Sequence, residues 1–192
     1  MMKTARFITI LSLLMVLSLV WGWTEENRKP ENEFELYRKL ILARNTDSRQ
    51  NLLTENPELI KEAFVLALQN VITKYKATHQ YEALEKNQEI LTEIYSLKHN
   101  SQLTHTLFEL GRTQLILQKF SAPVQTFNSA LDSLQNHNDP ELKARIFTHL
   151  AQAYLVLPDY ENADKYALQA LALSRKNQYK SLMAENYRTL SV

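Results

Sequence analysis

The stretch from Phe147 to Ala170 constrains the fold more strongly than any other part of the chain. Its first half places apolar residues three or four positions apart, the spacing of one helical face: Phe147, Leu150, Ala151 and Tyr154. Pro158 and Asp159 interrupt this pattern. A second face then begins, formed by Tyr160, Ala163, Ala167 and Ala170. Because alanine lets two helices approach closely, the stretch predicts a pair of packed helices.

Composition indicates that the rest of the chain is helical as well. Among 192 residues there are only two glycines and five prolines, and no β-branched alternation or Asn-Gly turn indicates a strand or a hairpin. We therefore expect an all-α protein. The net charge of +1 gives no reason to expect a nucleic-acid partner. The absence of cysteine excludes disulfides, thiolate metal sites and thiol catalysis.

The helix pair recurs along the chain at intervals of 39 to 40 residues. The unit formed by Leu107, Leu110, Gly111 and Phe120 matches Phe147, Leu150, Ala151 and Tyr160 at an interval of 40. An earlier unit matches less well at 39 residues: Val71, Ile72, Tyr75 and Tyr81. Helix starts are expected at Asn56-Pro57-Glu58, Ser121 with Pro123, and Asp139-Pro140. Turns are expected near His79, His99, Lys119, Asn138, Pro158 and Asn177.

These units resemble the tetratricopeptide repeat (TPR), in which an aromatic, Leu-Ala/Gly and Tyr precede a turn and small residues on a second helix. The period exceeds the standard repeat, so the resemblance is to the longer variants of bacterial signalling and regulatory proteins. Pro123 departs from the pattern's alanine, and Gln135 and Arg175 stand where a closing proline is usual. The resemblance implies that residues 57–192 form a right-handed α-solenoid of antiparallel helix pairs, about three repeats and the start of a fourth.

In TPR arrays the first helix of each repeat lines a concave groove that holds extended peptides or partner helices. Carried onto this chain, the groove positions are Gln69, Thr73, Lys76, His105, Phe108, Arg112, Arg145, Thr148, Gln152 and Arg188. Their cations would favour a protein or peptide partner with carboxylates, since arginine pairs with carboxylates bidentately. The alternative is that they are ordinary surface arginines. Phe108 is either a binding anchor or a packing residue.

Residues 1–22 are typical of a signal peptide or an N-terminal anchor. Lys3 and Arg6 precede a mostly apolar run from Phe7 to Val20, and small residues suit cleavage after Gly22. The run is shorter than the roughly 20 apolar residues of a spanning helix, although an uncleaved anchor stays open, with membrane contact through this segment alone. We therefore expect the repeats outside the cytoplasm, exported to the periplasm or the medium or held at the membrane.

Residues 23–56 are expected to be a linker with one short amphipathic helix. Its apolar positions are Phe34, Leu36, Tyr37, Leu40 and Ile41. A polar stretch, residues 44–51, follows the predicted helix.

Catalytic motifs are missing from the sequence. The histidines (His79, His99, His105, His137 and His149) are scattered, and no His-Glu-x-x-His pattern or phosphate-binding glycine loop occurs. We therefore expect a protein that is not an enzyme and has no cofactor or metal. Three tyrosines, Tyr154, Tyr160 and Tyr166, fit a helical core better than a stacking platform for nucleic acid.

The fourth unit begins with Tyr187, Leu190 and Ser191, and the sequence ends at Val192. We expect the chain to be the N-terminal part of a longer protein, or its last helix to be covered by another subunit, including by self-association. Two functions stay open: the extracytoplasmic sensory or interaction region of a membrane-bound signalling protein, and a free-standing exported scaffold or adaptor. An all-helical enzyme is a third, weaker alternative.

Overall fold

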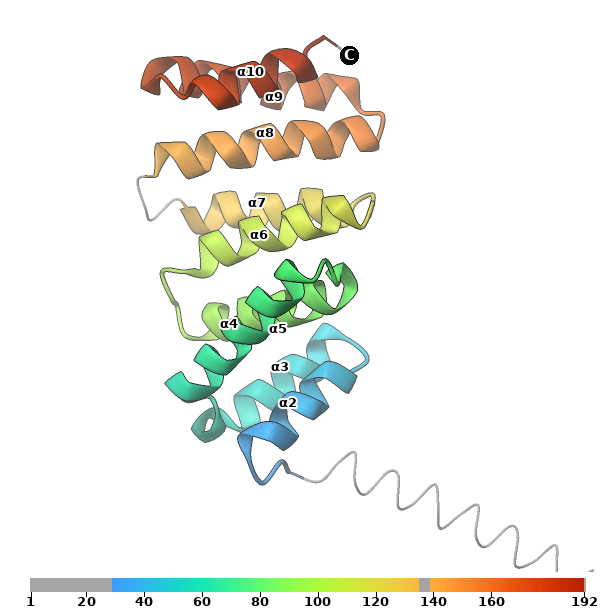
Figure 1. Cartoon of the computed structure of the whole chain (residues 1–192), viewed down its shortest axis with the longest axis vertical. Coiled ribbons are helices and arrows are strands. Elements are labelled where there is room, and N and C mark those ends of the chain that lie inside the picture. The colour runs from blue at the N-terminus through green and yellow to red at the C-terminus, as the bar shows by residue number, and fades with distance from the viewer. Residues whose placement is uncertain (1–28, 135–138, 192) are drawn as a thin grey trace, which may run out of the picture. The chain divides into compact units, whose positions relative to one another are not determined.

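The computed structural model describes residues 29–134 and 139–191. Within these ranges the chain forms nine α-helices, one short 3-10 helix and no strand (Figure 1). The prediction of an all-α protein is confirmed. The chain divides into two compact units, Met1–Ile60 and Lys61–Val192. The predicted signal segment, residues 1–22, lies outside the described residues.

The first unit contains α2 (Glu33–Leu42), α3 (Thr46–Glu55) and the 3-10 helix η1 (Pro57–Leu59). Helices α2 and α3 pack against each other, and each begins with an asparagine cap. The Asn32 side chain accepts a hydrogen bond from the Glu35 amide at 3.0 Å, and Asn45 accepts one from the Ser48 amide at 2.8 Å. Helix α2 is the predicted amphipathic helix.

Two expectations for this unit are wrong. The polar stretch at 44–51 belongs mostly to α3, which buries only one residue, Leu53, and so has almost no apolar periodicity to reveal it. Asn56 does not cap a long helix, because its buried side chain donates back to the Leu52 carbonyl at 2.7 Å and ends α3. Pro57 therefore begins only the three residues of η1, and the next long helix starts at Glu62.

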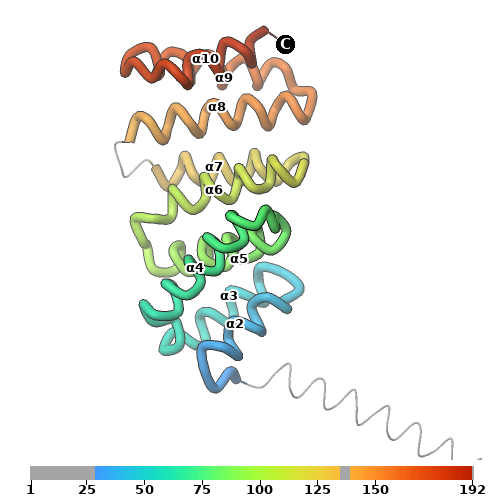
Figure 2. The backbone as a smooth tube through the Cα atoms, viewed as in Figure 1, coloured from blue at the N-terminus to red at the C-terminus, as the bar shows by residue number. Residues whose placement is uncertain are grey.

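The second unit is a succession of seven helices, each packed against the next (Figures 1 and 2). They are α4 (Glu62–Ala77), α5 (Tyr81–Leu97), α6 (Leu103–Ile116), α7 (Ala122–Leu134), α8 (Pro140–Val156), α9 (Tyr160–Asn177) and α10 (Lys180–Thr189). Helix α8 also packs directly against α6 and α10. The helices α4, α6, α8 and α10 are called the first-helix row below.

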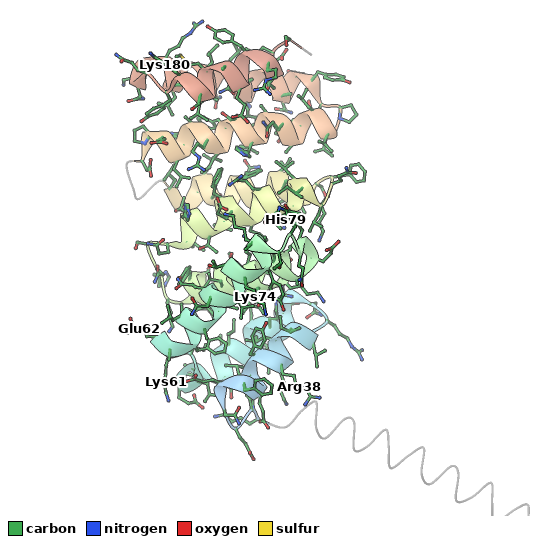
Figure 3. All side chains as sticks on the ribbon, in the orientation of Figure 1. Arg38, Lys61, Glu62, Lys74, His79 and Lys180 are labelled. Atoms are coloured by element: carbon green, nitrogen blue, oxygen red, sulfur yellow. The ribbon has the colours of Figure 1, made fainter. Side chains whose placement is uncertain are left out.

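The predicted turns agree with the helix boundaries. His79, His99, Lys119 and Pro158 lie between helices, and Asn177 is the last residue of α9. Asn138 lies outside the described residues. Figure 3 labels His79 at the turn from α4 to α5 and Lys180 at the start of α10. Helix α8 has the expected start: Pro140 is its first residue, and the Asp139 side chain accepts a hydrogen bond from the Leu142 amide at 2.9 Å.

Small residues lie where the helices of each pair meet. A Cβ added to Gly111 of α6 would be 2.5 Å from the Phe127 ring of α7, so only glycine permits this contact. In the next pair, Ala151 of α8 is fully buried, as are three alanines of α9: Ala163, Ala167 and Ala170. Gly111 and Ala151 therefore have the same place in successive pairs, as their 40-residue interval predicts.

The aromatic residues of the last pair only partly match the expected core. Tyr154 and Tyr166 stack with ring centroids 5.5 Å apart and planes within 5°, and Phe147 lies 5.9 Å from Tyr166. Tyr160, by contrast, is 60% exposed, so its assignment to the core is wrong. It is the first residue of α9, before the helix has entered the contact with α8.

Candidate functional site

Helices α6 and α8 of the first-helix row meet around the buried ring of Phe108. This ring makes a T-shaped contact with His149 of α8, with centroids 5.2 Å apart, and lies 6.1 Å from the Phe127 ring of α7. Phe108 and Phe127 are fully buried. The three rings form a rigid apolar floor, which is called the Phe108 floor below.

Two arginines lie over this floor. The Arg145 guanidinium carbon is 4.7 Å from the centroid of the Phe108 ring, and that of Arg112 is 5.8 Å from the same centroid. A guanidinium within about 6 Å of a ring is attracted to the π electrons, and this contact orients the charged group. Helices α6 and α8 thus bring two positive charges to one place on the first-helix row.

Glu109 neutralises part of this charge. Lys76 of α4 donates from Nζ to Glu109 Oε2 at 2.6 Å, and Arg112 donates from Nη1 to Oε1 at 3.0 Å. Burial alone would raise the pKa of Glu109, but the Lys76 hydrogen bond and the charges of Arg112 and Lys76 outweigh it and lower that pKa. Glu109 is therefore an anion that links α4 to α6.

His149 lies between the floor and the arginines. Its Nδ1 is 2.9 Å from the carbonyl of Arg145, and since a carbonyl only accepts, Nδ1 carries the proton in this contact. Burial lowers the pKa of His149, and the charges of Arg112 and Arg145 act in the same direction, while its hydrogen bond and Glu185 oppose them. The neutral ring is the favoured form.

The contact between α8 and α10 is polar. Gln152 donates from Nε2 to Glu185 Oε1 at 2.7 Å, and Asn186 donates from Nδ2 to the Thr148 hydroxyl at 3.0 Å. Thr148 and Asn186 are both fully buried. Glu185 and Asn186 thus join the last helix to the first-helix row by hydrogen bonds.

The predicted groove residues separate into those near the floor and those elsewhere. Arg112 and Arg145 lie over it, Lys76 reaches it through Glu109, and Gln152 contacts α10. His105 and Arg188 are exposed at other points of the row.

The two remaining predicted residues lie on α4. The exposed Thr73 donates to the Gln69 carbonyl at 2.9 Å. Gln69 itself donates to the Tyr95 hydroxyl at 2.6 Å and lines a hollow of about 430 Å³ beside α5, whose wall also includes Glu62, labelled in Figure 3.

Two of the predicted groove residues cannot contact a ligand. Phe108 and Thr148 are fully buried, because each faces the next helix of the row instead of the groove. Phe108 packs on His149 of α8, and Thr148 packs on Asn186 of α10. Phe108 is therefore the packing residue of the two alternatives, although its ring still supports both arginines.

Three residues of the site were not predicted: Glu109, His149 and Glu185. A signal for two of them is present in the sequence, since Glu109 and His149 are 40 residues apart and so have the same place in successive units. Both directly follow a buried position, Phe108 or Thr148. Glu185 has no such signal, because its role depends on how α10 packs on α8.

The arrangement is suited to binding anions. Within 29–134 and 139–191, no cluster of three or more His, Asp or Glu side chains is placed to hold a metal ion. No helix in these ranges combines the length and apolarity needed to cross a membrane. What the site offers is N–H donors and positive charge over an apolar floor, a combination that recognises carboxylates.

Comparison with known proteins adds no relative. No protein-family model matches the chain, and no curated protein matches it.

Proposed function

We propose that residues 57–192 form a TPR-type right-handed α-solenoid that binds an acidic segment of a partner protein, as a binding module without catalytic activity. The recurrence of small residues at the contact within each helix pair supports this family, Gly111 in one pair and Ala151 in the next. The direct packing of α8 on both α6 and α10 supports a continuous row of first helices. Such a row provides one surface long enough for an extended peptide.

The observation that carries the binding role is the pair of arginines over Phe108. Among the described residues, no carboxylate lies within 4.0 Å of the Arg145 guanidinium, so its charge is balanced only by the ring. A guanidinium held against an apolar surface has already lost part of its water. A ligand carboxylate would therefore gain a strong hydrogen-bonded pair there at a smaller desolvation cost.

We further propose that this module works outside the cytoplasm, as the sensory or interaction region of a membrane-bound signalling protein. Support comes from the sequence of residues 1–22, where Lys3 and Arg6 precede the apolar run. The long repeat period supports a signalling role by its resemblance to variants in bacterial signalling proteins.

Binding can be tested with fluorescein-labelled hexaglutamate and hexalysine peptides by fluorescence polarisation. The wild type should bind hexaglutamate and not hexalysine. The double variant Arg112→Ala/Arg145→Ala should bind hexaglutamate about two- to thirtyfold more weakly, as expected for two partly exposed charge pairs. Binding should weaken as salt rises, because exposed charges are screened over about 10 Å at 0.1 M.

A matched control removes two positive charges elsewhere. Lys86 of α5 and Lys176 of α9 are exposed and lie on second helices. Lys86→Ala/Lys176→Ala should therefore bind hexaglutamate almost as the wild type does. Equal weakening by both double variants, or tighter binding of hexalysine, would contradict the arginine site.

A further inference from the structure

The two arginines over Phe108 differ in how they are paired. Arg112 donates to Glu109 at 3.0 Å, whereas among the described residues no carboxylate is within 4.0 Å of Arg145. In this arrangement only one of the two guanidiniums is free to take a ligand carboxylate. The other is already occupied by a carboxylate of the protein itself.

Glu109 is firmly placed for this occupancy. Each of its oxygens has its own cation, Lys76 on Oε2 and Arg112 on Oε1, and its side chain is only 17% exposed. The Arg112 side chain is 39% exposed, so solvent and ligand can still reach its guanidinium. A second carboxylate that approached Arg112 would meet both a partly used set of donors and the negative charge of Glu109.

We propose that Glu109 is a built-in competitor for the ligand at Arg112. A first ligand carboxylate pairs with Arg145, and a second must take Arg112 from Glu109, which Lys76 continues to hold. The site therefore selects segments with two neighbouring acidic side chains over those with one. This inference rests on the proposed function and assigns a specificity-determining residue to it.

The test is the affinity of Glu109→Gln for the same hexaglutamate peptide. Glutamine keeps the size of the side chain and removes its negative charge. We expect the variant to bind about three- to tenfold more tightly than the wild type, since a like charge has left the site. It should also bind a hexapeptide with a single glutamate among glycines better than the wild type does, because pairing at Arg112 no longer needs a competing second acid.

Two comparisons separate this effect from a general gain in positive charge. Glu161→Gln, at an exposed position in the first turn of α9, makes the same change in net charge and should leave the affinity unaltered. In an Arg112→Ala background, Glu109→Gln should give no gain, because the competition takes place at Arg112. A gain that is equal in Glu161→Gln, or that persists without Arg112, would overturn the proposal.

The outcomes distinguish this inference from the function on which it rests. If the wild type binds hexaglutamate and Glu109→Gln binds it equally well, the competitor role fails while the binding site stands. If neither protein binds any acidic peptide, the proposed function fails and the competitor role with it. Circular dichroism melts verify that each variant is folded, and Glu109→Ala, which also lacks the carboxylate, should show the same gain if Glu109→Gln does not fold.

Discussion

At the scale of single residues, His149 illustrates how packing changes ionisation. Its ring lies 5.2 Å from the Phe108 ring and 5.9 Å from the Phe127 ring, measured between centroids. The charged groups that face it are Arg112 of α6, Arg145 of α8 and Glu185 of α10. Burial, reinforced by the two arginines, lowers the pKa of His149 below its ordinary value of 6.5. The folded protein therefore resists a proton that the unfolded chain accepts.

The sign of the resulting pH dependence follows from linkage. Between the folded-state pKa of His149 and 6.5, the unfolded chain binds more protons at this position than the folded chain does. Stability from the neutral ring is fully present above pH 6.5 and is lost as pH falls below it. We expect urea denaturation at pH 7.5 and pH 5.5 to show a loss of stability on acidification that is smaller in His149→Gln. His105→Gln, an exposed position on α6, should keep the wild-type difference, and equal differences in all three proteins would contradict the assignment to His149.

The residues of the site show what the sequence can and cannot predict. The positions of Arg112 and Arg145 on one row of helices follow from the repeat spacing. The burial of Phe108 and Thr148 does not, because it depends on how closely the next first helix approaches. The pairing of Lys76 with Glu109 is equally out of reach, since it joins residues 33 positions apart on two helices whose distance the sequence leaves unstated.

At the scale of helices, α6 and α7 approach closely because Gly111 has no side chain. Glycine in a helix costs about 1 kcal/mol relative to alanine, so its presence here requires compensation. The compensation is the Phe127 ring, which occupies the space that a Cβ would need, with ring atoms 2.5 to 2.9 Å from that position. Phe127 is fully buried and packed against Phe108 and His149, so the ring has little room to move.

Replacing Gly111 with alanine should therefore destabilise the fold in spite of the better helix propensity. Overpacking a core typically costs about 1–3 kcal/mol, against a propensity gain of about 1 kcal/mol, so we expect a net loss of up to about 2 kcal/mol in urea denaturation. In a Phe127→Leu background the clash is relieved, and Gly111→Ala should become neutral or stabilising. A rise in stability on Gly111→Ala in the wild-type background would show that α7 can move away from α6 at little cost.

The helices were predictable where local signals agree. Helix α8 has a capping aspartate, a proline at its first position and alanines at its contact with α9, and all three signals are visible in the sequence. Helix α3 has a capping asparagine but buries only Leu53, so hydrophobic periodicity could not reveal it. The proline at 57 predicted a helix start, yet the Asn56 side chain was already used by the preceding helix.

At the scale of the whole molecule, the proposed binding site and the proposed export depend on different parts of the chain. The site is built from residues of Lys61–Val192, and export is inferred from residues 1–22, which lie outside the described residues. The two proposals can therefore fail independently. The location of the repeats still matters for the site, because it determines which partner proteins Arg112 and Arg145 can meet.

Export is tested by fusing the chain after Ser191 to a reporter phosphatase that needs disulfides and is active only outside the bacterial cytoplasm. We expect the fusion to be active, because Lys3 and Arg6 followed by an apolar run are typical of an export signal. Leu13→Glu/Val16→Glu places two charges within the run and should abolish reporter activity. Cleavage after Gly22 would give a mature protein that begins at Trp23, which N-terminal sequencing detects, whereas an uncleaved anchor would keep the fusion in the membrane fraction. Equal reporter activity in the wild type and the charged variant would show that the run does not direct export.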